Sequence, residues 1–170
     1  MDLNRLTNGE KLVLYCSGAL VVLSFVPLWA SYSFEPIGGL EGIDTSQSFN
    51  AWSGAYNFLV KLAILCALVA VGLVIGKAAG AMFSLPPATY LGLGGAATLF
   101  LLIGVLTGPN DGGIGAFGEL VGLDVSRGIL LFVGLILAGG AAYGGYQHMQ
   151  GLPGSTTTFG GRQAPPAPPA

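Results

Sequence analysis

Charged residues are scarce in this chain of 170 residues: Asp, Glu, Lys and Arg together make up 8% of it, against about a quarter in ordinary soluble domains. Hydrophobic residues make up 52%. A soluble fold of this composition would lack the polar side chains that cover a water-facing surface. Six basic and eight acidic residues give a formal net charge of -2, which argues against a nucleic-acid binder with a basic face.

Cysteine and histidine are also rare, and this argues against several kinds of chemistry. The two cysteines, Cys16 and Cys66, lie inside apolar runs and are expected to be packed thiols rather than a disulfide. His148 is the single histidine and has no Cys, Asp or Glu at ligand spacing, so we expect an interfacial residue rather than a metal or haem ligand. The serines of the chain have no histidine nearby to activate them. We therefore expect no cofactor and no enzymatic activity.

Long hydrophobic runs, in contrast, are abundant. Crossing a hydrocarbon layer of roughly 30 Å takes about 20 apolar residues, all in helix because lipid cannot hydrogen-bond a bare backbone. Four runs meet this requirement, at residues 12–30, 58–76, 90–107 and 128–146. They predict an all-α membrane protein, a four-transmembrane-helix bundle over residues 1–150. Trp29 and Tyr32, at the end of the first run, are predicted to form an aromatic belt at the interface.

The distribution of basic residues predicts the orientation. Arg5, Lys11, Lys77 and Arg162 lie on one side of the predicted spans, and only Arg127 lies on the other. Because lysine and arginine are retained on the cytoplasmic side, we expect both termini in the cytoplasm and the acidic, glycine-rich connections outside, in the cell (inner) membrane.

The two outer connections share a short sequence pattern. Residues 42–46 read Gly-Ile-Asp-Thr-Ser and residues 122–126 read Gly-Leu-Asp-Val-Ser. One interpretation is that both are helix N-caps, since Asp and Ser accept hydrogen bonds from free backbone N–H groups. The other is a duplicated helical hairpin, so that the fold consists of two repeats.

Small residues recur at four-residue spacing in the predicted spans, which lets helix backbones approach closely in lipid. They pack the helices of one bundle, or they mediate self-association through the last span. Hydroxyls in the spans (Ser17, Ser24, Thr98 and Thr107) are expected to bond to their own helix. The predicted packing positions are Gly72, Gly76, Gly80, Gly92, Ala96, Gly140 and Gly144.

Lys61 is the one ionisable residue that falls within an apolar run, a few residues inside the outer end of the second span, and it is a candidate functional residue. It would act as a pathway cation or pair with Glu35 or Asp44. Alternatively, its long stem extends to the headgroups, since it lies close to the outer end of its span. Residues 151–170 are polar and proline-rich, which predicts a disordered cytoplasmic tail that is either a plain linker or a polyproline ligand.

The run Phe-Val-Pro-Leu-Trp at 25–29, the run Ser-Phe-Asn-Ala-Trp at 48–52 and the opening Leu-Thr-Asn-Gly-Glu-Lys at 6–11 resemble a broad group of uncharacterised four-span bacterial membrane proteins. The resemblance covers roughly the first 75 residues and implies a bacterial inner-membrane location, with no known activity. Claudin-type proteins also have four spans and a Trp-bearing first outer loop, but this loop lacks their paired cysteines.

Together these observations predict a non-catalytic membrane protein, an interaction or scaffold unit or an accessory subunit of a membrane assembly. Its partners would be the lipid bilayer and either another protein or a second copy of itself, joined through small-residue helix faces, with no nucleic acid. The alternative is a small oligomeric channel or transporter, with Lys61 and the outer acids at its mouth.

Overall fold

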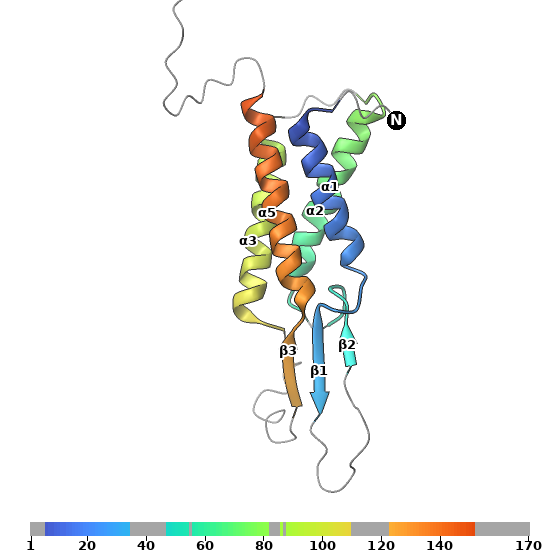
Figure 1. Ribbon diagram of the computed structural model, residues 1–170, viewed down its shortest axis with the longest axis vertical. Helices are drawn as coiled ribbons and strands as arrows, with labels where there is room; N and C mark the ends of the chain where they lie inside the picture. The colour runs from blue at the N-terminus through green and yellow to red at the C-terminus, as the bar shows by residue number, and fades with distance from the viewer. Residues whose placement is uncertain are drawn as a thin grey trace, which may run out of the picture.

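The computed structural model describes residues 6–34, 47–54, 56–81, 86, 88–109 and 123–151, which form four α-helices and three β-strands (Figure 1). The helices are α1 (Asn8–Leu23), α2 (Phe58–Ala78), α3 (Thr89–Thr107) and α5 (Ile129–Gln150), and the strands are β1 (Ala30–Phe34), β2 (Gln47–Phe49) and β3 (Leu123–Arg127). The helices lie side by side, and the strands stand beyond one end of the bundle, which we call the sheet end. The opposite end, where α1 begins and α5 finishes, is the far end.

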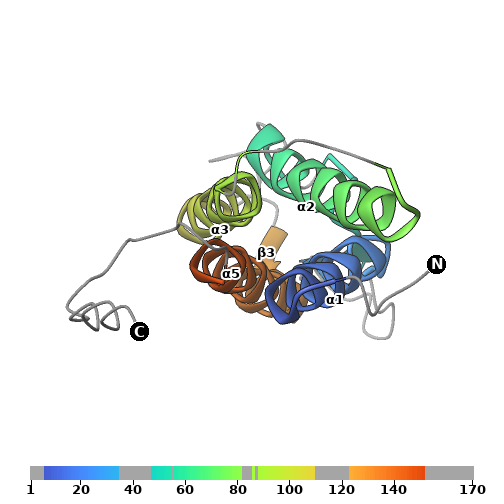
Figure 2. The same ribbon diagram turned by 90° about the horizontal axis from the view of Figure 1, so that it is seen from above.

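The helices form a ring in the order α1, α2, α3, α5, so that α5 packs between α1 and α3 (Figure 2). Helices α2, α3 and α5 are each long and apolar enough to cross a membrane. Their bounds lie close to the predicted spans at 58–76, 90–107 and 128–146. The helical, membrane-type architecture predicted from composition is therefore confirmed for these three helices, whereas the small sheet was not predicted.

The helix of the first predicted span, 12–30, ends earlier than expected, because α1 ends at Leu23. In a longer helix Pro27 would have to donate to the carbonyl of Leu23, and proline has no N–H. The indole Nε1 of Trp29 supplies that hydrogen bond instead, at 2.7 Å. The Ser24 hydroxyl donates to the carbonyl of Val21 at 2.6 Å, so the last turn keeps its acceptors bonded without further helix.

Trp29 is the centre of the sheet end rather than part of an aromatic belt, since its side chain is completely buried. The backbone N–H of Trp29 donates to the carbonyl of Phe49 at 3.1 Å. Its backbone carbonyl accepts from Gly128 N–H at 2.7 Å and from the Tyr56 hydroxyl. Burial raises the pKa of Tyr56 to about 12, because the phenolate would lose its hydration. These bonds hold the strands and the start of α5 against the outer end of α1.

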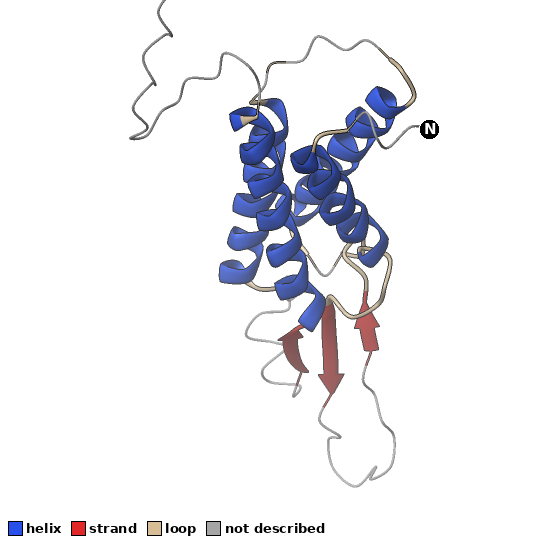
Figure 3. Ribbon diagram, turned by 45° about the horizontal axis from the view of Figure 1, so that its top comes forward, coloured by secondary structure: helices blue, strands red, loops and turns tan. Residues whose placement is uncertain are grey.

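The three strands form an antiparallel sheet in the order β2-β1-β3 (Figure 3). Ser31 in β1 lies opposite Ser48 on one side and Ser126 on the other, so a row of serines crosses the sheet. The Ser31 and Ser126 hydroxyls are 2.6 Å apart and hydrogen-bonded. One of the two interpretations of the pattern at 122–126 was a cap of the fourth helix, but residues 123–126 lie in β3 and the N-cap of α5 is Gly128.

Glycines of α5 allow close packing on both of its neighbours in the ring. A Cβ on Gly140 would lie 2.8 Å from Cys16 Sγ, and one on Gly144 would lie 2.8 Å from the Gly9 carbonyl, both on α1. On the other side, Gly145 meets the backbone of α3. The predicted positions Gly140 and Gly144 thus pack helices of one chain, which is the first of the two interpretations of the small-residue spacing.

The other predicted packing positions lie elsewhere. A Cβ on Gly72 or Gly92 would meet nothing within 4 Å, so neither position contacts another helix of this chain. Gly80 follows the end of α2 with φ 93° and, with the N–H of Ala81 bonded to the carbonyl of Gly76, forms a Schellman-type helix end. Ala96 is half-buried on α3. Gly80 is therefore a helix terminator rather than a packing residue.

Candidate functional site

Glu10 is completely buried, although it lies in the first turn of α1. Its N–H donates to Thr7 Oγ1 at 3.2 Å, and its Oε2 accepts from Thr7 N–H at 2.9 Å. This reciprocal capping box satisfies two donors that the start of a helix leaves free. It also explains why α1 begins at Asn8, ahead of the predicted span, and it fixes the direction of the Glu10 side chain.

Lys77 meets this carboxylate from the last turn of α2. Its Nζ lies 2.5 Å from Glu10 Oε1, and its side chain is 42% exposed while that of Glu10 is 0% exposed. A buried carboxylate is costly unless a charge and hydrogen bonds compensate for the lost water. Lys77 supplies the charge, and its own exposure keeps part of the ammonium hydrated.

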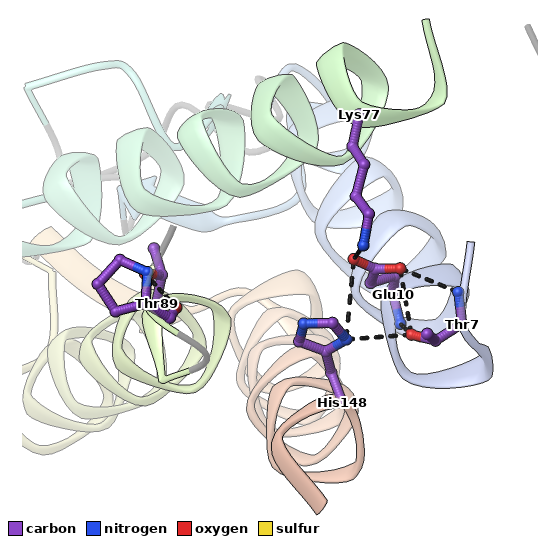
Figure 4. A network of polar contacts seen from close by, with 6 residues as sticks. Thr7, Glu10, Lys77, Thr89 and His148 are labelled. Atoms are coloured by element: carbon purple, nitrogen blue, oxygen red, sulfur yellow. Dashed lines mark hydrogen bonds and ion pairs between the residues drawn. The ribbon is translucent and has the colours of Figure 1, made fainter. Parts of the chain in front are cut away.

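His148 completes the arrangement from α5. Its Nδ1 lies 3.2 Å from Thr7 Oγ1 and 3.7 Å from Glu10 Oε1. The ring packs edge-on against Tyr90 of α3, with centroids 5.3 Å apart and planes at 78°. We call Thr7, Glu10, Lys77 and His148 the Glu10 cluster (Figure 4). Counting Tyr90, it brings together residues of all four helices at the far end.

The Glu10 cluster places an ammonium and an imidazole next to the same carboxylate oxygen, Glu10 Oε1. In the described part of the chain, every buried side-chain nitrogen and oxygen has a hydrogen-bond partner. The Thr7 hydroxyl also lies within hydrogen-bonding distance of Glu10 Oε2, at 3.2 Å. The direct effect of these contacts is to cross-link the helices.

The structure gives a mixed result for the residues that sequence patterns singled out. Lys61 is half-buried near the sheet end of α2 and makes no ion pair within the described residues. Its predicted partners, Glu35 and Asp44, lie outside the described residues, as do the tail beyond residue 151 and most of the second outer connection. Cys16 and Cys66 are both free thiols, as predicted.

Two threonine hydroxyls of the predicted spans bond to their own helix, as expected. Thr98 donates to the carbonyl of Gly94 at 2.8 Å, and Thr107 to that of Ile103 at 2.9 Å, each within its own helix. His148, which was expected just beyond the fourth span, lies in the last turn of α5 and is buried.

Sequence reasoning missed Glu10 as a site residue, although a signal was present. Thr7 and Glu10 stand three residues apart just before an apolar run, which is the pattern of a capping box. The cap can be predicted from this spacing. The contact with Lys77, 67 residues along the chain, cannot, because it depends on how α1 and α2 pack.

Comparison with family models found none that matches the chain, and comparison with curated proteins found no match either.

Proposed function

We propose that this chain is a four-span membrane protein that works without catalysis, as an interaction or accessory subunit of a membrane assembly. Its task would be to hold a small β-sheet at a fixed position on the membrane surface, where a partner binds it. One observation carries the proposal: strands from both connections at the sheet end form one sheet, and Trp29 fixes that sheet to the bundle.

In this proposal α1 crosses the membrane together with α2, α3 and α5. A Cβ on Gly9 would meet the backbone of Gly144 near the far end of α5, and a Cβ on Gly134 would meet Leu20 near the sheet end. A layer crossed by α5 is therefore also crossed by α1. The 16 residues of α1 rise about 24 Å, less than the roughly 30 Å of hydrocarbon. Residues 24–29, where every backbone N–H donates a hydrogen bond within the protein, would cover the remaining depth.

The far end would face the cytoplasm of a bacterial cell, with the inner membrane as the location. Thr7 and His148 are in contact there, so the start of α1 and the end of α5 lie on the same side of the membrane. Of the described basic residues that flank the predicted spans, Lys11 and Lys77 belong to the far end and Arg127 to the sheet end, whereas Lys61 lies within a span, close to the sheet end. This distribution favours a cytoplasmic far end by the positive-inside rule. The two outer strands β2 and β3 each lead toward a following helix, which is compatible with two repeated hairpins.

The second candidate function is a channel or transporter. One hollow between the described helices, lined mainly by alanine and other small residues, leaves no space for a water molecule. A path through one chain would require the helices to separate, so this function needs an oligomer with a path between chains. A liposome flux assay on the wild type and Lys61→Ala would detect it, through flux that depends on Lys61.

The interaction proposal is tested by extracting the tagged protein from its native membrane in mild detergent and measuring the mass of the complex. We expect a species well above the 17.2 kDa of one chain. Gln47→Arg, on the exposed strand β2, should release the partner, whereas Gln147→Arg, exposed on α5 at the far end, should not. A monomer with no partner that supports full cellular function would refute the proposal.

A further inference from the structure

A surface hollow of about 230 Å³ lies at the sheet end, where β1 meets the start of α5. It is lined by Leu28, Ser31, Ser48, Arg127, Gly128 and Ile129. We call it the Arg127 hollow. The row of serines that crosses the sheet contributes two of its members, Ser31 and Ser48, so hydroxyl groups and a guanidinium line the same space.

These groups are suited to an oxyanion. A guanidinium presents several N–H donors in a fixed plane and pairs with phosphate, and serine hydroxyls donate to phosphate oxygens. Ser31 is already bonded to Ser126, but a hydroxyl has one donor and two acceptor positions, so this bond leaves further capacity.

Arg127 is exposed, and no side chain that the structure describes forms an ion pair with it. Its guanidinium lies over Gly108, where a Cβ would be 3.3 Å from Nη2. A second, more open hollow of about 600 Å³ borders the other side of Arg127, against Thr107, Pro109 and Phe132. The cation is therefore accessible from two sides.

The apolar neighbours of the Arg127 hollow point to an occupant with a hydrocarbon part. Ile129, the first residue of α5, is 68% exposed, and Leu28 is 51% exposed. On the α3 side, Leu106 is 71% exposed. Large apolar side chains exposed at the ends of apolar helices mark the edge of the hydrocarbon layer. Arg127 thus stands at the level where lipid phosphates lie.

We propose that the Arg127 hollow binds a membrane phospholipid, with the headgroup phosphate on Arg127, Ser31 and Ser48 and an acyl chain along Ile129. This site goes beyond the interaction role, although it rests on the membrane location. Binding would be reversible and would involve no covalent step. The phosphate would neutralise the charge of Arg127.

The experiment is a lipid titration of the full chain in mild detergent, followed by native mass spectrometry, with phosphatidylglycerol, the phosphate-free lipid diacylglycerol and inorganic phosphate as probes. Arg127→Gln should weaken phosphatidylglycerol binding by at least about tenfold, the loss expected for a charge-assisted hydrogen bond. Arg127→Lys should weaken it less, since a point charge remains. Lys61→Gln is the matched control. It removes a cation near the sheet end of α2 that does not line the Arg127 hollow, and it should leave phosphatidylglycerol binding unchanged.

Diacylglycerol binding should be the same in the wild type and Arg127→Gln, and millimolar inorganic phosphate should not displace phosphatidylglycerol. Equal phosphatidylglycerol affinity in the wild type and Arg127→Gln would overturn the site. Displacement by inorganic phosphate alone would overturn the lipid assignment and leave a free-anion site. The interaction proposal fails by a different result, the absence of any partner in the wild-type extract, so the two failures are distinguishable.

Discussion

Lys77→Met and Glu10→Gln remove the same ion pair, yet they should destabilise the protein to different extents. The reason is the unequal burial of the partners, with Glu10 0% exposed and Lys77 42% exposed. Lys77→Met leaves a carboxylate enclosed in the bundle without its main counter-charge. Glu10→Gln leaves a lysine that can turn toward water, and the glutamine oxygen can still accept from Thr7 N–H.

The magnitudes follow from this asymmetry. Breaking a buried ion pair so that one charge remains costs about 3 to 5 kcal/mol. The Thr7 hydrogen bonds and His148 keep some compensation for Glu10, so we expect about 2 to 4 kcal/mol for Lys77→Met. For Glu10→Gln, which loses one charged hydrogen bond and strands no buried charge, we expect about 1 to 2 kcal/mol.

The assay is equilibrium unfolding of the wild type, both single variants and the double variant in mixed micelles, with the helical circular dichroism signal followed against added denaturing detergent. The double variant should cost less than the sum of the singles, by about 1 to 3 kcal/mol, because both singles disrupt one interaction. If Glu10→Gln cost as much as Lys77→Met, the assignment of Glu10 as the buried, dependent partner would be refuted.

Two further predictions concern helix packing and the sheet end. Gly94→Ala should destabilise the bundle by about 1 to 3 kcal/mol, since its Cβ would lie 2.5 Å from the backbone nitrogen of Ala142. Gly72→Ala should be neutral or slightly stabilising, because nothing lies within 4 Å of a Cβ there. Thermal unfolding of both variants in micelles checks this, and equal losses of stability would contradict it. Tyr56 should make the protein sensitive to alkali: its folded pKa of about 12 lies above the ordinary value of 10.0, so its contribution is complete below pH 10 and is lost as the pH rises through 12, by about 2 to 3 kcal/mol. Stability measured between about pH 9 and about pH 12 should fall less steeply in Tyr56→Phe, and parallel curves would rule the effect out.

The Arg127 hollow and the Glu10 cluster show different limits of sequence reasoning. Arg127 is visible in the sequence as the one basic residue of the outer connections, but the serines around it come from three strands that meet only in the sheet. The alternation of serine with Tyr32 and Phe34 in β1 is a strand pattern, yet it directly follows the first apolar run, and Tyr32 was predicted to lie in an aromatic belt.

The sequence by itself determined that the chain is helical and apolar enough for a membrane, because hydrocarbon requires long unbroken apolar runs and α2, α3 and α5 have them. It also contained the capping box that starts α1 and the proline that ends it, since both act over a few residues. Only the tertiary structure decided that Lys77 and His148 reach Glu10 and that Ser48 and Ser126 flank Ser31. These partners are far apart along the chain, and their contacts depend on the order and spacing of helices and strands, which no local pattern encodes.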